Sequence, residues 1–230
     1  MTTVYIISAP SGSGKSTLVE KVRPIVPQLD FSISYTTRAP RGSEQNGREY
    51  FFVSRDEFQR MAARNEFLEY AEVFGNFYGT ARRFLQEAEQ KHHDLLLDID
   101  VQGAEQIKRK LPAAVSIFIL PPDRKTLESR LRNRSLDAEN VIQRRLVTAS
   151  REIENYGKYD YILINDRLEE SVEALKAILL AERSKHGGVQ RSADDPEMLA
   201  QAERCRLSNV RERLQPILAS FVAATTPGGR

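Results

Sequence analysis

The stretch Ala9–Thr17, APSGSGKST, decides how this chain folds because of what stands on either side of it. The apolar run Thr3–Ser8 precedes it, and Leu18, Val22 and Ile25 follow it at helical spacing. Between a strand and a helix, the pattern G-x-x-x-x-G-K-S/T cradles nucleotide phosphates on backbone N–H groups and the helix N-terminus. A serine- and glycine-rich turn is the alternative, and the joint strand, loop and helix favour the phosphate loop.

Two side chains of this loop have specific expected roles. Lys15 reaches the terminal phosphates in such a loop, and the hydroxyl of Ser16 binds Mg²⁺. Ala9 stands where the pattern has its first glycine, and alanine is small enough to let the backbone wrap a phosphate. The residues expected to contact the nucleotide are Ala9, Pro10, Ser11, Gly12, Ser13, Gly14, Lys15, Ser16 and Thr17.

Three further apolar runs, each followed by a helical pattern, are predicted as buried strands. They are Asp94–Ile99, Val115–Leu120 and Asp160–Asn165. Short runs that are apolar throughout are typical of parallel strands covered on both faces. The sequence therefore predicts an α/β fold with a doubly wound parallel sheet.

Asp98 and Asp100 stand at the carboxyl end of one of these strands, where open α/β sheets bind ligands. Residues two apart share a face of a strand. We expect Asp98 near Mg²⁺, directly or through water, and Asp100 turned toward a second substrate. The alternative is that both merely cap the following helix.

Between the first helix and Asp94 the chain becomes aromatic and polar, as in REYFFVS and FLEYAEVFGNFYGT. This spacing predicts short, mostly antiparallel strands in a small inserted domain. A helix resumes in GTARRFLQEAEQK, with Thr80 as its expected N-cap.

The second half of the chain has an arginine-rich helix–turn–helix pattern. Asp123 is its expected N-cap, and Ser135–Asp137 form its turn. HGGVQRSADD is predicted to be a linker, and Pro196 to lie in the first turn of one final helix. That helix has an apolar side made of Leu207, Val210, Leu214, Ile217 and Phe221.

The composition of the chain limits which partners and which cellular compartment we expect. Lys and Arg number 34 against 32 Asp and Glu, a net charge of +2, so no general surface for nucleic acid or anionic membranes is expected. No run approaches the roughly 18 apolar residues of a membrane span. The single cysteine, Cys205, is expected to be a packed residue in a helix. One cysteine agrees with a reducing compartment, and we expect a cytoplasmic protein.

The polar stretch Ser34–Tyr50, SYTTRAPRGSEQNGREY, has three possible interpretations: a linker, a nucleic-acid loop or one wall of a small-molecule site. A phosphate loop alone is compatible with a kinase, a GTPase or a motor. No N-K-x-D motif for guanine reading by GTPases occurs in the chain. The second set of anion-binding and polar residues therefore has to be explained.

Four motifs after the phosphate loop keep one order: SYTTRAPRGSEQNGREYFFV, FLEYAEVFGNFYGT, LLLDIDVQGA and RLRNRSLDAENVIQRRL. From about Val4 to Lys185 the chain thereby resembles the guanylate kinases, which transfer the γ-phosphoryl group of ATP to GMP. The resemblance implies that GMP phosphate is held by Arg38, Arg41, Tyr50 and Tyr78. It implies that guanine is surrounded by Ser34, Glu69, Thr80 and Asp100.

The same resemblance implies the catalytic and ATP-binding residues. The positions that match lid arginines are Arg130, Arg134 and Arg145, while Arg124, Arg132 and Arg144 are expected to form a solvated basic face. Together with Lys15 and Arg38, the lid arginines are the expected catalytic residues. Adenine is expected near Arg134, Asn165 and Asp166. The expected cofactor is Mg²⁺ with ATP, and its expected protein ligands are Ser16 and Asp98.

The expected architecture is a P-loop kinase core with a small mixed α/β GMP-binding insert and a helical lid. Its segments are a core of 1–33, 81–122 and 151–186, an insert of 34–80, a lid of 123–150, and a linker with a C-terminal helical extension of 187–230. ATP and GMP are the expected partners, with dGMP possible and no nucleic acid or membrane. A monomer and a homodimer both stay open.

Two rival functions remain at this point. One is a kinase of another nucleoside monophosphate, which Glu69 with Ser34 disfavours because this pair fits guanine. The other is a binding module, since guanylate-kinase-like domains of scaffold proteins hold phosphorylated peptides in the GMP-binding region. Such modules typically have degenerate phosphate loops, whereas Gly14, Lys15 and Ser16 are intact here.

Overall fold

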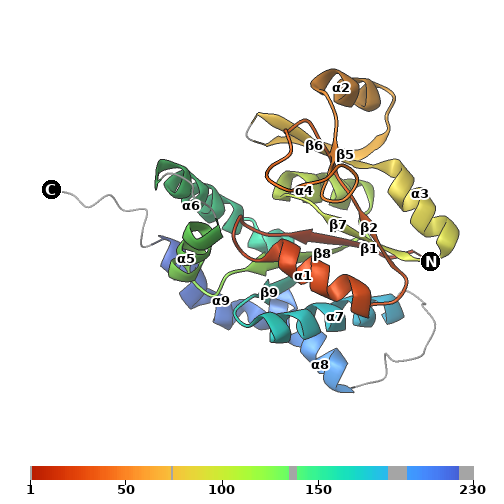
Figure 1. Ribbon diagram of the computed structural model, residues 1–230. Coiled ribbons are helices and arrows are strands. Elements are labelled where there is room, and N and C mark those ends of the chain that lie inside the picture. Colours follow the sequence, from red (N-terminus) through yellow and green to blue (C-terminus); the bar gives the residue numbers. More distant parts are fainter. Residues whose placement is uncertain (1, 74, 135–138, 186–195, 223–230) are drawn as a thin grey trace. The chain divides into compact units, whose positions relative to one another are not determined.

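The computed structural model describes residues 2–73, 75–134, 139–185 and 196–222 (Figure 1). The chain divides into two compact units. Unit 1 comprises Met1–Ile7 and Pro27–Val115, and unit 2 comprises Ser8–Val26 and Ser116–Arg230. Within the described ranges, we find no helix with both the length and the apolar character needed to cross a membrane.

Unit 1 contains parallel strands in the order β2-β7-β1. They are β1 (Val4–Ser8), β2 (Leu29–Ser32) and β7 (Asp94–Asp98). Every residue of β1 is buried, as a strand covered on both faces requires. The helices α3 (Arg82–Lys91) and α4 (Val101–Lys110) complete this part. The sequence did not predict β2, whose first three residues are only half-buried.

The insert forms a second sheet in unit 1, in the order β4-β3-β6-β5. The pairs β3–β6 and β5–β6 are antiparallel and β3–β4 is parallel, so the expectation of mostly antiparallel strands is confirmed. Phe58, Met61 and Phe67 form its small apolar core. The elements are β3 (Tyr35–Thr36), β4 (Phe51–Phe52), α2 (Arg55–Ala63), β5 (Phe67–Val73) and β6 (Asn76–Ala81).

Thr80 is not a helix cap, so that prediction is wrong. It lies inside β6, and the N-cap of α3 is Ala81, which makes no side-chain capping bond. The hydroxyl of Thr80 donates instead to Oε1 of Glu69 at 2.6 Å. Because residues alternate faces along a strand, Thr80 points at its neighbour on β5 rather than along the helix axis.

Unit 2 contains the parallel pair β8–β9 and the helix that follows the phosphate loop. The α/β class with parallel strands is thereby confirmed. Thr126 N donates to Oδ1 of Asp123 at 2.6 Å, as expected for an N-cap, while the turn expected at 135–137 lies outside the described residues. The elements are α1 (Lys15–Val22), η1 (Arg23–Ile25), β8 (Val115–Leu120), α5 (Arg124–Arg134), α6 (Glu139–Ile153), η2 (Tyr156–Lys158), β9 (Tyr161–Ile164) and α7 (Leu168–Lys185).

The apolar stripe of the first helix is shorter than expected. Leu18, Val19 and Val22 are buried where α1 packs against α7 (Figure 1), but Ile25 is 42% exposed. Pro24 follows the end of α1 and the chain tightens there into the 3₁₀ turn η1. The tighter turn moves Ile25 off the helical stripe.

The C-terminal extension contains two helices, so the prediction of a single final helix is wrong. They are α8 (Pro196–Arg204) and α9 (Leu207–Val222), both blue in Figure 1. The break falls at Cys205 and Arg206, so Cys205 lies between helices rather than in one. On α9 the expected side is buried at Val210, Leu214, Ile217 and Phe221. The expected linker, 186–195, lies outside the described residues.

Candidate active site

The phosphate loop bends through two glycines with left-handed backbone. Gly12 has φ 92° and Gly14 has φ 87°, values that favour glycine. Ser13 N donates to the carbonyl of Pro10, and Leu18 N to that of Gly14, which starts α1. The loop therefore leads directly into the N-terminus of α1, and a helix N-terminus attracts anions.

The side chains of the phosphate loop differ in their exposure to solvent. Lys15 is half-buried and is the first residue of α1. Ser16 and Thr17 are exposed on its first turn, Ala9 and Ser11 are half-buried, and Pro10 is buried.

Both glycines are also places of close approach. A β-carbon on Gly12 would lie 2.9 Å from Cδ2 of Leu131, on α5. A β-carbon on Gly14 would lie 2.3 Å from Nδ2 of Asn165, the residue that follows β9. That Nδ2 donates to the carbonyl of Ser13 at 2.7 Å, and Asn165 is buried. Two elements far away in sequence therefore fix the shape of the loop.

Two of the expected lid arginines lie in this region of unit 2. Nη2 of Arg130 donates to the carbonyls of Asn165 at 3.0 Å and Asp166 at 3.5 Å. Its Nη1 is buried and makes no hydrogen bond within the described part of the chain. Nη2 of Arg145 donates to Oγ of Ser11 at 3.0 Å. The N–H groups of Arg130 Nη1 can still donate a hydrogen bond to an anion.

The other arginines of α5 and α6 differ in burial and in their ion pairs. Arg134 ends α5, and its side chain is outside the described part. Arg132 forms ion pairs at the surface with Glu128 and Glu139, and Arg144 is exposed. Arg124 is half-buried at the start of α5.

In unit 1, the residues expected around the GMP phosphate form a group of one arginine and two tyrosines. The guanidinium of Arg38 lies 5.3 Å from the ring centre of Tyr50, whose ring meets Tyr78 edge to face at 5.9 Å. Arg41 is exposed on the same loop. Guanidinium and phenol groups together can saturate the oxygens of a phosphate dianion.

Sequence reasoning missed a further residue of this group, Glu44. Its Oε2 and Oε1 accept from Nη1 and Nη2 of Arg38, both at 3.0 Å, and Oε2 also accepts from Arg41 N at 2.7 Å. The fork-to-fork pair holds the guanidinium in one plane. Its only signal in the sequence is a carboxylate within reach of both arginines in one short loop.

The residues expected around guanine include a buried carboxylate. Glu69 on β5 is 4% exposed, and beside it lie Thr80, which donates to it, and Asp100, the N-cap of α4. The pKa of Glu69 is raised to about 7, mainly by burial and also by the charge of Asp100, although the bond from the Thr80 hydroxyl lowers it. A β-carbon on Gly103 would lie 2.6 Å from Oε2 of Glu69. This group can accept two hydrogen bonds from a planar ligand edge.

Two further expected site residues lie on strands or links of unit 1. Ser34 is half-buried in the short link between β2 and β3, and its carbonyl accepts from Phe51 N at 2.9 Å. Asp98 ends β7 opposite Ile7 of β1 and is half-buried. Among the described residues, no group of three His, Cys, Asp or Glu side chains is placed to hold a metal ion.

Comparison with known proteins identifies the family of the chain. The family model described as "Guanylate kinase" matches residues 1–182. The chain belongs to the guanylate kinase family. It is therefore a nucleoside monophosphate kinase, a transferase with a P-loop.

Named guanylate kinases support this membership along the chain. The protein "Guanylate kinase" of Koribacter versatilis is 60% identical over 228 residues, 98% of each chain. That of Geobacter metallireducens is 50% identical over 182 residues, 79% of this chain and 90% of its own. The solved guanylate kinase structure from Anaplasma phagocytophilum has a TM-score of 0.65 at 33% identity and covers 94% of both chains. The Geobacter match is shorter than the chain by about the length of the C-terminal extension.

Proposed function

We propose that this chain transfers the γ-phosphoryl group of ATP to GMP, giving ADP and GDP. The observation that carries the proposal is Glu69, a buried carboxylate held between Thr80 and Asp100. A carboxylate here accepts from both N1–H and the 2-amino group of guanine, donors that adenine lacks on this edge. Ser34 donates to O6. Sites that hydrogen-bond specific groups reject analogues without them by ~10⁴–10⁵.

The GMP phosphate is held by Arg38, Arg41, Tyr50 and Tyr78 in this proposal. Arg38 already lies beside the Tyr50 ring, fixed by its two bonds to Glu44. A guanidinium held in one plane loses less rotational freedom when it binds a dianion. Glu44 is therefore a positioning residue, which orients Arg38 for the phosphate.

ATP binds the phosphate loop of unit 2 in this proposal. Backbone N–H groups of Ala9–Thr17 cradle its phosphates, and Lys15 reaches the terminal ones. Arg130, Arg134 and Arg145 stabilise negative charge on the transferring group, where an arginine can be worth ~10³–10⁵ in rate. The adenine lies near Arg134, Asn165 and Asp166.

Magnesium is part of the proposed ATP complex. Ser16 offers a hydroxyl oxygen and Asp98 a carboxylate oxygen, the hard ligands that Mg²⁺ prefers. In nucleotide sites the ion takes one or two protein ligands and completes its shell with phosphates and water. The small protein donor set therefore fits Mg²⁺, which when bound neutralises charge on ATP.

The chemistry needs no covalent nucleophile on the protein. A GMP phosphate oxygen attacks in line, and the charge on the three equatorial oxygens of the transferring group is offset by Lys15 and the arginines. Exclusion of water prevents ATP hydrolysis, so closure of the insert (34–80) and the lid (123–150) over the core (1–33, 81–122 and 151–186) belongs to the proposal. A cytoplasmic location, with ATP and GMP or dGMP as partners, completes it.

The experiment that tests this function is ATP-dependent ADP formation with GMP as acceptor. The unsubstituted chain and Lys15→Ala are compared under identical conditions. GMP-dependent turnover of the unsubstituted chain far above that of Lys15→Ala is expected. Turnover with GMP no higher than that of the variant means that the proposed reaction is wrong.

A further inference from the structure

The C-terminal extension, α8 and α9, is joined to strand β9 by backbone hydrogen bonds. Ile162 N donates to the carbonyl of Cys205 at 2.8 Å, and Leu207 N donates to that of Asp160 at 3.1 Å. Arg206 and Tyr161 thereby form an antiparallel bridge. The turn between α8 and α9 thus pairs with β9 like a short additional strand.

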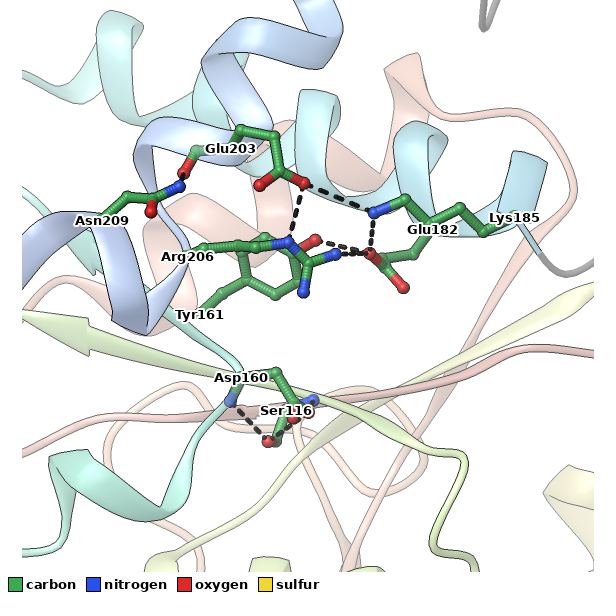
Figure 2. A network of polar contacts seen from close by, with 8 residues as sticks. All are labelled: Ser116, Asp160, Tyr161, Glu182, Lys185, Glu203, Arg206 and Asn209. Carbon is green, nitrogen blue, oxygen red and sulfur yellow. Dashed lines mark hydrogen bonds and ion pairs between the residues drawn. The ribbon is translucent and has the colours of Figure 1, made fainter.

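A polar network locks this turn in place (Figure 2). Glu182 on α7 is only 7% exposed and accepts from Arg206 Nη2 at 2.8 Å, Lys185 Nζ at 2.9 Å and the Tyr161 hydroxyl at 2.5 Å. Nε of Arg206 also donates to Glu203 on α8 at 2.7 Å. The Arg206 guanidinium lies 4.9 Å from the Tyr161 ring centre. A buried carboxylate with this many partners strongly favours one arrangement of the turn.

Helix α9 makes a second junction, with the lid helix α5. The backbone N–H of Arg124, the first residue of α5, donates to Oγ of Ser220 at 3.1 Å. Asp123 satisfies Thr126 N of the same turn. The first N–H groups of a helix have no partner within it, so Ser220 acts as a cap supplied from outside α5. Ile217 and Phe221, on the same side of α9, are buried.

Both junctions lead to the phosphate loop. Strand β9 ends directly before Asn165. The side-chain amide of Asn165 donates to the Ser13 carbonyl and lies against Gly14. Helix α5 carries Leu131, which packs on Gly12, and Arg130, which bonds to the Asn165 carbonyl. The extension therefore contacts the two elements that fix this loop.

We propose that α8 and α9 form a brace that holds Asn165 and Arg130 on the phosphate loop, with Ser220 as a positioning residue for ATP. The proposal rests on the proposed function, in which this loop binds ATP. It gives the extension, which lies beyond the matched residues 1–182, a role in the nucleotide site. The GMP group in unit 1 contains none of these contacts.

The test compares Ser220→Ala with Ser220→Thr and Ser208→Ala. Threonine keeps the hydroxyl, and Ser208 is an exposed serine of the same helix whose hydroxyl donates to its neighbour Asn209. Affinity for a non-hydrolysable ATP analogue is measured by calorimetry, with KM for ATP and for GMP from initial rates. Amide hydrogen exchange of Arg124–Arg134 is followed in parallel.

For Ser220→Ala we expect ATP affinity to fall up to about fivefold, the loss of one cap, with KM for ATP raised to match. Exchange in α5 should be faster and KM for GMP unchanged. Ser220→Thr and Ser208→Ala should behave like the unsubstituted chain. Unchanged ATP affinity in Ser220→Ala overturns the brace, and so does an equal rise in both KM values, which indicates general destabilisation. Failure of the unsubstituted chain to bind the analogue or use GMP refutes the proposed function instead.

Discussion

Gly103 gives the carboxylate of Glu69 the room it occupies, since a β-carbon there would lie 2.6 Å from Oε2 of Glu69. Gly103 stands in the first turn of α4 with ordinary helical backbone, so its conformation alone does not require glycine. Its N–H donates to Oδ1 of Asp100 at 2.8 Å. Glycine is therefore required here because α4 lies so close to the buried carboxylate of Glu69.

Gly103→Ala should weaken GMP binding while leaving the fold intact. Alanine is favoured over glycine within a helix by about 0.5–1 kcal/mol, which offsets part of the strain. Displacing Glu69 removes charged hydrogen bonds, so we expect the Kd for GMP to rise about 10- to 100-fold. Calorimetry with GMP and with an ATP analogue checks this. Equal losses for both ligands, or no loss for GMP, would contradict the placement.

GMP affinity should depend on pH through Glu69. Burial holds the pKa of this carboxyl at about 7, and only its ionised form accepts from both guanine donors. Below pH 7, Glu69 must therefore release a proton before GMP binds, and GMP affinity should fall about tenfold per pH unit. Binding is measured from pH 5.5 to 8.5. Because the GMP phosphate itself titrates near pH 6, Glu69→Gln serves as the control and should lose the Glu69 component. Parallel pH profiles for both proteins contradict the assignment.

Glu69 should also make the fold less stable as the pH rises. Its folded pKa is raised above the ordinary 4.5, so the folded state binds the extra proton between pH 4.5 and about 7. Stability from this group is present below pH 4.5 and is lost as pH rises through 7. Urea unfolding of Glu69→Gln should lack this decline, and its stability relative to the unsubstituted chain should increase from pH 5 to 8. A constant difference across this range is the contrary result.

Arg130 should matter far more than Arg132, its neighbour on the same helix. Arg130 bonds to the Asn165 carbonyl, and its buried Nη1 has no hydrogen-bond partner among the described residues, whereas Arg132 pairs with Glu128 and Glu139 at the surface. We expect Arg130→Ala to lower kcat by ~10³ or more. Arg132→Ala should stay within a few fold, because surface ion pairs contribute little. Similar kcat values for the two variants would refute the lid assignment.

Glu182 should stabilise the brace mainly at neutral pH. Burial raises the pKa of its carboxyl, but bonds from Tyr161 and Lys185 and the charge of Arg206 outweigh it, so the pKa lies below the usual 4.5. The stability it contributes is present above pH 4.5 and is lost as pH falls through the folded pKa. Urea unfolding should find Glu182→Gln less stable at pH 7, with the gap closing in acid.

The matched control for that experiment is Glu173→Gln on the same helix. Glu173 pairs with Lys176 at 3.1 Å but is largely exposed, so its loss should change stability little at any pH. A loss in Glu182→Gln no larger than that in Glu173→Gln would show that the buried network does not hold the extension.

The phosphate loop and the strands around it could be predicted because their signals are local. Gly12, Gly14 and Lys15 lie within a few residues, and apolar runs such as Val115–Leu120 can only be buried. Strand β2 has no continuous apolar run, and at four residues its alternation of apolar and polar residues is too short to predict a strand. Its pairing with β7 stabilises it as one.

The remaining features depend on contacts that no local pattern encodes. Neither glycine nor proline marks the break at Cys205 and Arg206, where pairing with β9 and the buried charge of Glu182 end α8. Likewise Glu44 becomes a partner of Arg38 only through the folded loop, and Gly103 faces Glu69 only through the packing of α4 on β5. The side-chain roles that sequence reasoning missed therefore depend on how the chain folds back on itself, over six residues for Glu44 and over more than thirty for Gly103 and Glu69.

The most direct test of the account is the ratio of kcat/KM for GMP to that for AMP, measured with ATP for the unsubstituted chain and for Glu69→Gln. A site that reads guanine through a buried carboxylate should give a ratio of ~10⁴ or more, and the variant should lose most of it through GMP rather than AMP. A ratio near one in the unsubstituted chain, or an unchanged ratio in Glu69→Gln, would contradict the account.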